Sequence, residues 1–125
     1  MNERTLTGPE KDVLSKLLSV GSESWMQQRP TWLDTVMVAE MHDGGMGSLA
    51  FVPESDEYDR PLKVLVQGEF EDIDGTTVSI AVLVDKRERA AELDVWKVDF
   101  SPLLDWPDPE RVRVKVPASG ARPRS

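Results

Sequence analysis

The chain has 125 residues, no cysteine and a formal net charge of −8, so it is long enough for one hydrophobic core and too short for two. The lack of cysteine excludes disulfides, thiolate metal sites and a cysteine nucleophile. The acidic balance argues against a binder of nucleic-acid phosphates, because such an interface needs a basic footprint.

The N-terminal segment has the pattern of an amphipathic helix. Thr7 and Glu10 have the spacing of a capping box, and Pro9 lies in the first turn, where a missing N–H costs nothing. Leucine and valine then recur on one helical face, and Gly21 stands where a left-handed residue would end the helix. The pattern predicts a helix over residues 8–20 that covers the core.

Two short strands are predicted next, at residues 35–41 and 48–52, which are rich in Val, Met and Phe. Between them lies Asp43-Gly44-Gly45-Met46-Gly47, a composition typical of a hairpin loop that requires positive φ. The preceding residues 22–34 are interpreted as a connector, and residues 53–61 as an exposed acidic loop.

Three further strands, at residues 63–72, 76–85 and 91–98, have the clearest β pattern in the chain. Asp72-Ile73-Asp74-Gly75 suits a type I turn with a glycine bulge, which pairs Phe70 with Val78. The large β-branched residues of the first two strands then share one face.

The register of the third of these strands follows from keeping its apolar side chains on the same face. We predict that Val84 lies opposite Leu93. On the other face, this register places Trp96 beside Ala81. The sheet therefore has an apolar inward face and a mixed outward face.

The C-terminal part is predicted to differ from the body of the chain. Residues 101–106 have the N-cap serine and first-turn proline of a short helical turn. Residues 107–125 contain five basic and two acidic residues. Within them, residues 111–116 alternate as an edge strand would, and residues 117–125 are predicted to be disordered.

These elements together predict a single α+β domain over residues 1–107. Its N-terminal helix packs on an antiparallel β-meander of about five strands, and a short C-terminal helical turn follows. Residues 108–125 form a basic tail.

Two segments resemble a known bacterial family: residues 41–49 (MHDGGMGSL) and residues 92–103 (ELDVWKVDFSPL). The family is domain of unknown function 6984. The resemblance covers roughly residues 4–107, implies a bacterial origin and supplies no activity. The chain departs from the family at Arg87-Glu88-Arg89, where a glycine is expected.

The glycine-rich loop is one candidate site. The backbone N–H groups of Asp43, Gly44, Gly45 and Ser48 could form a concavity for an anion. The alternative, which we favour, is a hairpin that needs glycine geometry, and no P-loop lysine follows the glycines. His42, the single histidine, is interpreted as a surface turn residue.

Lys97 and Asp99 form a second candidate, on the nominal core face just past Val95, where an unpaired charge is costly. Either the strand has left the core there or the charges find partners at its margin. The functional alternative makes Lys97 a site residue beside the glycine-rich loop. Oxygen ligands for a hard metal could come from Asp43, Asp94, Asp99 and Asp105, but the calcium-loop spacing is missing, so we expect no metal. No motif indicates a cofactor or a catalytic residue, and we expect neither.

The outward sheet face is the third candidate. An aromatic anchor within a charged rim resembles a protein-binding surface. The alternative is that the N-terminal hairpin, the connector or the basic tail covers this face. The predicted members of the face are Leu65, Ala81, Leu83 and Trp96, with Glu69, Glu71, Glu92 and Asp94 around them.

Three functional hypotheses remain open, because no motif assigns an activity. The first is a cytoplasmic binding module for a basic protein, such as an immunity protein that neutralises a bacterial toxin. The second is a small enzyme or ligand-binding domain with a site near residues 43–48 and Lys97. The third is self-association through Trp96 or residues 111–116, so monomer and homodimer both stay open. We expect no nucleic-acid partner, because the chain is acidic. We expect no membrane partner, since no run of about 20 apolar residues occurs.

Overall fold

The computed structural model describes residues 3–52 and 58–115. Within them, seven strands form one antiparallel sheet in the order β1-β2-β3-β6-β5-β4-β7. The strands are β1 (Glu3–Thr5), β2 (Met37–Glu40), β3 (Leu49–Phe51), β4 (Lys63–Glu71), β5 (Thr77–Val84), β6 (Ala90–Lys97) and β7 (Arg113–Lys115). The helices are α1 (Gly8–Gly21), α2 (Glu23–Gln27), α3 (Trp32–Thr35) and the 3-10 helix η1 (Pro109–Arg111).

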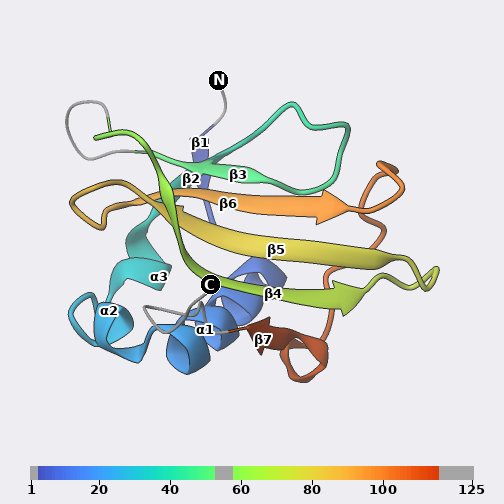
Figure 1. Cartoon of the computed structure of the whole chain (residues 1–125), viewed down its shortest axis with the longest axis horizontal. Coiled ribbons are helices and arrows are strands. Elements are labelled where there is room, and N and C mark those ends of the chain that lie inside the picture. Colours follow the sequence, from blue (N-terminus) through green and yellow to red (C-terminus); the bar gives the residue numbers. More distant parts are fainter. Residues whose placement is uncertain (1–2, 53–57, 116–125) are drawn as a thin grey trace, which may run out of the picture.

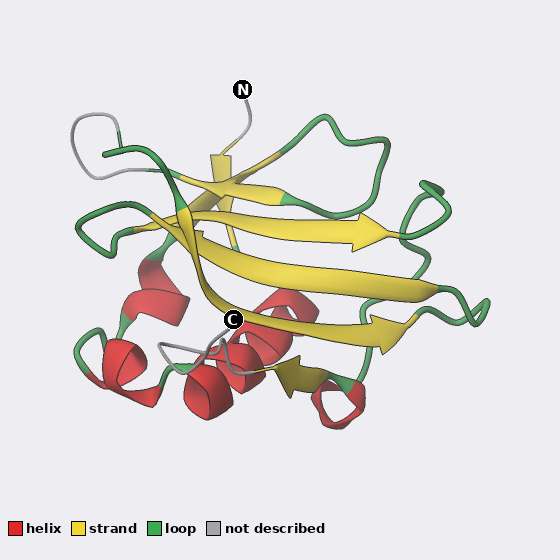
Figure 2. Cartoon of the chain, in the orientation of Figure 1, coloured by secondary structure: helices red, strands yellow, loops and turns green. Residues whose placement is uncertain are grey.

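The predicted α+β class is confirmed, whereas the strand number is seven and not about five. The sheet is also not one continuous meander, because β3 pairs with β6 and not with β4. The connector predicted at residues 22–34 contains α2 and most of α3. Figure 1 shows the three α-helices gathered on one side of the sheet, with α1 next to β4 and β7, and Figure 2 shows the separation of helices from strands by colour. None of the described helices is long and apolar enough to cross a bilayer.

Helix α1 begins with the predicted capping box. The Thr7 hydroxyl accepts a hydrogen bond from the Glu10 N–H, and the Glu10 carboxylate accepts one from the Thr7 N–H. These bonds satisfy backbone donors that a helix N-terminus leaves unpaired. The apolar stripe of α1 is fully buried in the core and consists of Val13, Leu14, Leu17 and Leu18.

Gly21 ends α1 for a different reason from the one predicted. Its φ is not positive, so the left-handed interpretation is wrong. A Cβ at this position would overlap the side chain of Val66 on β4. Glycine therefore permits the close approach of the helix end to the sheet.

The β4–β5 hairpin has the predicted glycine-bulge turn. The Asp72 N–H donates to the Thr76 carbonyl at 2.9 Å, and Gly75 has a φ of 84°. Phe70 lies opposite Val78, and both side chains are fully buried. The apolar and mixed faces of the sheet are therefore assigned correctly.

A β-bulge near the start of β4 changes one residue of the outward face. The register shifts between Val64 and Val66, which places Val64 opposite Leu83. Leu65, predicted to face outward, packs against the core instead. Val64 takes its place on the outward face and is 42% exposed.

The β5–β6 register is displaced by two residues from the prediction. Val82, not Val84, lies opposite Leu93, and Trp96 lies opposite Ser79. From Val78 to Leu83, this shift of two keeps the side chains on their predicted faces, since strand side chains alternate, and a further register shift places Val84 opposite Ala90. The register follows from the short β5–β6 loop, in which Glu88 takes a left-handed φ of 63°, a conformation that glycine adopts more readily.

Residues 101–106 do not form the predicted helical turn. Their backbone N–H groups bond to other parts of the chain: Leu103 donates to the Gly45 carbonyl, and Leu104 and Asp105 donate to the Asp72 carboxylate. Donors used in this way cannot form helical bonds. Leu103 and Trp106 pack against the core edge, as predicted.

The basic tail supplies part of the fold. Strand β7 pairs with β4, so part of the edge strand predicted at residues 111–116 is present, but it begins only at Arg113 because Arg111 belongs to η1. The predicted disorder at residues 117–125 and most of the acidic loop lie outside the described residues.

Candidate functional site

The glycine-rich loop is organised by its own aspartate. The Asp43 carboxylate accepts hydrogen bonds from the N–H groups of Met46 at 3.1 Å and Ser48 at 3.0 Å. Burial opposes ionisation of Asp43, but these bonds outweigh it and lower its pKa. Gly44 and Gly45 have φ of 76° and 83°. These contacts favour the hairpin interpretation, since the carboxylate occupies the place where an anion would bind.

Ser48 has a structural role at the end of this loop. Its hydroxyl is buried, accepts from the Val95 N–H at 2.9 Å and donates to the Val95 carbonyl at 3.1 Å. A hollow of about 250 Å³ lies beside the loop, lined in part by Asp43, Gly45 and Ser48, but Lys97 does not line it. The structure therefore does not join the loop and Lys97 into one pocket.

Lys97 is fully buried and fully paired. Its ammonium group donates to the carboxylates of Asp72 and Asp74, both at 2.9 Å, and to the Pro102 carbonyl at 3.2 Å. Burial lowers the Lys97 pKa, but the bonds to Asp74 and Asp72 outweigh this and raise it. We call Lys97, Asp72 and Asp74 the Lys97 cluster. All three ammonium protons have acceptors, so the cluster has the chemistry of a structural ion pair.

Asp99 lies outside the Lys97 cluster. It is exposed, and its carboxylate accepts hydrogen bonds from the Ser101 hydroxyl at 2.6 Å and the Ser101 N–H at 3.0 Å. The hydroxyl bond is the main reason for its lowered pKa. Asp99 therefore stabilises the bend after β6.

The buried and paired carboxylates predict a loss of stability in acid. The Lys97 ammonium lowers the pKa of Asp74 to about 2, and burial of Asp85 is outweighed by hydrogen bonds that lower its pKa to about 2. Their ordinary pKa in an unfolded chain is about 3.9. Because the folded pKa is lower, the stabilisation is complete above about pH 5 and is lost as the pH falls from 4 to 2.

Urea unfolding at pH 7, 4, 3 and 2.5 measures this loss. We expect the free energy of unfolding to fall steeply below pH 4. In an Asp85→Asn variant, the same decrease should be shallower. A free energy of unfolding that is constant from pH 7 to 2.5 would contradict the assignment.

The outward sheet face is open within the described residues. Around a shallow hollow of about 260 Å³ lie Val64, Leu83, Asp94 and Trp96, and we call this surface the Trp96 face. Trp96 is 45% exposed. The connector does not cover it, because α2 and α3 direct Trp25 and Trp32 toward the core on the other side. The β1–β2 pair extends the sheet at its edge.

Phe100 adjoins the Trp96 face and was not foreseen from the sequence. Its ring centroid lies 6.0 Å from that of Trp96, and the residue is 67% exposed. Its backbone has a φ of 64°, which is rare for a bulky residue. The sequence signal was limited to an aromatic residue directly after a strand.

The predicted acidic rim is neutralised on one side. Arg113 contacts Glu71 at 2.7 Å and Glu69 at 3.4 Å, and Lys115 contacts Glu69 at 3.2 Å. These bonds lower the pKa of both glutamates. The rim along β4 therefore has mixed charge, because β7 lies beside it.

The rim along β6 keeps its negative charge. Asp94 is exposed beside Trp96, and Glu92 is half-buried on the same strand face. Burial, and then the charge of nearby Asp43, raise the Asp94 pKa. The repulsion between these two carboxylates marks the β6 end as the acidic part of the face.

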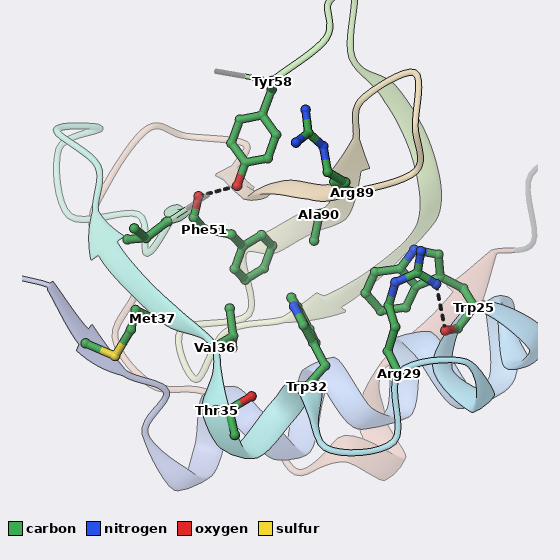
Figure 3. Close-up of a pocket in the computed structure, with 11 residues that line it drawn as sticks. Trp25, Arg29, Trp32, Thr35, Val36, Met37, Phe51, Tyr58, Arg89 and Ala90 are labelled. Atoms are coloured by element: carbon green, nitrogen blue, oxygen red, sulfur yellow. Dashed lines mark hydrogen bonds between the residues drawn. The ribbon is translucent and has the colours of Figure 1, made fainter. Parts of the chain in front are cut away.

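A third hollow was not predicted at all. It has a volume of about 460 Å³ and lies between α2, α3, β3 and the loop before β6 (Figure 3). We call it the aromatic pocket. The residues that line it are Trp25, Arg29, Trp32, Thr35, Val36, Met37, Phe51, Val52, Tyr58, Arg89 and Ala90. The available signal was Trp25, Arg29 and Trp32 in one polar connector.

Comparison with family models gives one match, over residues 3–107, to a family described as domain of unknown function DUF6984. The chain belongs to this family. The DUF6984 region runs from β1 to the segment before η1, so it includes Trp96, Phe100 and the aromatic pocket but not β7. No curated protein and no solved structure matches the chain.

Proposed function

We propose that the chain is a protein-binding module that docks a basic protein through the Trp96 face. The observation that carries this proposal is the exposed Trp96–Phe100 ring pair on an open sheet face. Paired aromatic side chains at the centre of a surface are the usual anchors of protein interfaces. Burying an aromatic ring is more favourable than leaving it in water, so two rings left exposed side by side need an explanation.

The conformation of Phe100 supports the same proposal. Its left-handed φ costs roughly 1–2 kcal/mol for a residue with a side chain. That conformation leaves the ring largely in solvent next to Trp96. A strained backbone that exposes an aromatic ring is explained by a partner that covers the ring.

Charge favours a basic partner. Asp94, which lies on β6 with Trp96, is close enough to Asp43 for their carboxylates to repel each other. Asp99 is exposed next to Phe100 in the chain, and the whole chain has a net charge of −8. Such a surface attracts a cationic protein and orients it during encounter. An immunity protein of a bacterial competition system, acting in the cytoplasm on a basic toxin, fits this size and charge.

The test compares variants of one immobilised protein. The native chain is immobilised, and a partner is captured from a bacterial source, identified and purified. The dissociation constant of this partner is then measured for the native chain, Trp96→Ser and Val20→Ser. Val20 is a matched control, since it is also exposed, at 54%, but lies on α1. We expect a basic partner whose dissociation constant rises about 30-fold with Trp96→Ser and stays unchanged with Val20→Ser.

Three results would overturn this proposal. They are capture of an acidic partner, equal affinity of the partner for Trp96→Ser and the native chain, and failure to capture any partner that binds the native chain more tightly than Trp96→Ser. Light scattering at micromolar concentration addresses self-association. A dimer that Trp96→Ser dissociates would assign the face to a second copy of the chain instead.

A further inference from the structure

We propose that the aromatic pocket is a binding site for a small planar aromatic carboxylate. It shares no lining residue with the Trp96 face, so the proposal is independent of the function proposed above. Its volume of about 460 Å³ is within the range of small-molecule sites. Three features of the pocket support the assignment: fixed aromatic walls, the charge of its described side chains, and one arginine that forms no ion pair with any described residue.

The walls are held in place by ring-to-ring contacts. Trp32 lies edge-on to Trp25, with centroids 5.1 Å apart, and edge-on to Phe51, with centroids 5.0 Å apart. The Tyr58 hydroxyl donates to the Phe51 carbonyl, which fixes the opposite wall. In Figure 3, Trp32 approaches from below and Tyr58 from above. Rings that are already ordered bind a flat apolar ligand at a low entropic cost.

The charge of the pocket is opposite to that of the chain. Among its described lining residues, the charged side chains are those of Arg29 and Arg89, and none is a carboxylate. The whole sequence has 23 acidic and 15 basic residues. Two arginines facing a mainly aromatic hollow in an acidic protein favour an anionic ligand and disfavour a cationic one.

Arg29 is the residue positioned to bind the anion. Its guanidinium lies 4.3 Å from the centroid of Trp25, and its two terminal nitrogens donate to the carbonyls of Trp25 and Glu88. In residues 3–52 and 58–115, it forms no ion pair with a carboxylate. Arg89, in contrast, is paired with buried Asp85 at 2.8 Å.

These contacts specify the ligand class. An aromatic ring between Trp32 and Tyr58 meets apolar surface on both sides, and a carboxylate on that ring reaches a guanidinium with remaining donor capacity. A neutral analogue keeps the ring contacts and loses the ionic hydrogen bond. The difference between acid and neutral amide therefore isolates the role of Arg29.

The experiment titrates the full chain with 2-naphthoate and with 2-naphthamide, by calorimetry and by NMR of the tryptophan indole N–H groups. We expect saturable binding of naphthoate, shifts of the Trp25 and Trp32 indole signals, and about tenfold weaker binding of the amide. Arg29→Gln should reduce naphthoate affinity about tenfold, and Arg29→Lys should restore part of it. Arg111→Gln, an exposed arginine on η1, is the matched control and should change nothing.

The proposal is overturned if naphthoate does not bind saturably, if acid and amide bind equally, or if Arg29→Gln and Arg111→Gln have the same effect. Shifts confined to the Trp96 indole would also overturn it, because they would place the ligand on the other face. Thermal unfolding of each variant shows whether a loss of binding reflects a loss of fold. If Arg29→Gln does not fold, the naphthoate affinity of Arg29→Lys is compared with that of the native chain instead.

Discussion

Replacing Asp72 by alanine is expected to lower the free energy of unfolding by about 3–5 kcal/mol, because it leaves the buried ammonium group of Lys97 without its buried partner. The same substitution removes the acceptor of the backbone N–H groups of Ile73, Leu104 and Asp105. Urea denaturation at pH 7 measures the change. The midpoint should fall with the slope unchanged if the folded state stays compact.

Two controls separate the buried charge from the lost backbone contacts. Asp74 bonds to the same ammonium group but is 38% exposed, so Asp74→Asn should have a clearly smaller effect. Adding Lys97→Met to Asp72→Ala should recover part of the lost stability, because no unpaired charge then remains in the core. A double variant less stable than Asp72→Ala alone would show that the unpaired ammonium group is not the main cause of the lost stability.

Replacing Asp85 by alanine is expected to cost about 3 kcal/mol, because its buried carboxylate holds the β5–β6 loop together. It accepts from the N–H groups of Asp59, Arg87 and Arg89 and from the Arg89 side chain. Loss of these bonds should also release the left-handed turn at Glu88. Hydrogen exchange of the loop amides and urea unfolding measure both effects.

The matched control for Asp85 is Asp59, which pairs with Arg87 at the surface at 2.8 Å. Exposed pairs of this kind contribute less than about 1 kcal/mol, so Asp59→Asn should change stability little. Equal losses for Asp85→Ala and Asp59→Asn would contradict the structural role of the buried carboxylate.

Local signals in the sequence were sufficient for α1 and the β4–β5 hairpin. Both depend on residues within a few positions of each other: Thr7 with Glu10, and Asp72 with Gly75. Residue parity along the strands placed Trp96 on the outward face. The β5–β6 register was wrong by two because a glutamate at residue 88 gives no sign of a left-handed turn. Strand β1 has no alternating apolar pattern and was missed.

The candidate sites were harder to predict, because distant segments meet there. The aromatic pocket combines Trp32, Phe51, Tyr58 and Arg89 from separate parts of the chain. Neutralisation of Glu69 depends on the pairing of β7 with β4, for which the sequence indicates a strand but not its neighbour. The 101–106 segment was assigned a helix because its N-cap pattern is local, whereas the Asp72 carboxylate that takes its amides is about 30 residues away.

The two outermost strands of the sheet, β1 and β7, are each three residues long. Within the described residues, such short edges offer few free backbone groups to a neighbouring molecule, and the charged side chains of Arg113 and Lys115 on β7 also disfavour pairing with another strand. Growth of the sheet by addition of strands from other copies is therefore discouraged. We therefore expect a partner to contact the side chains of the sheet face and not the backbone of its edge strands.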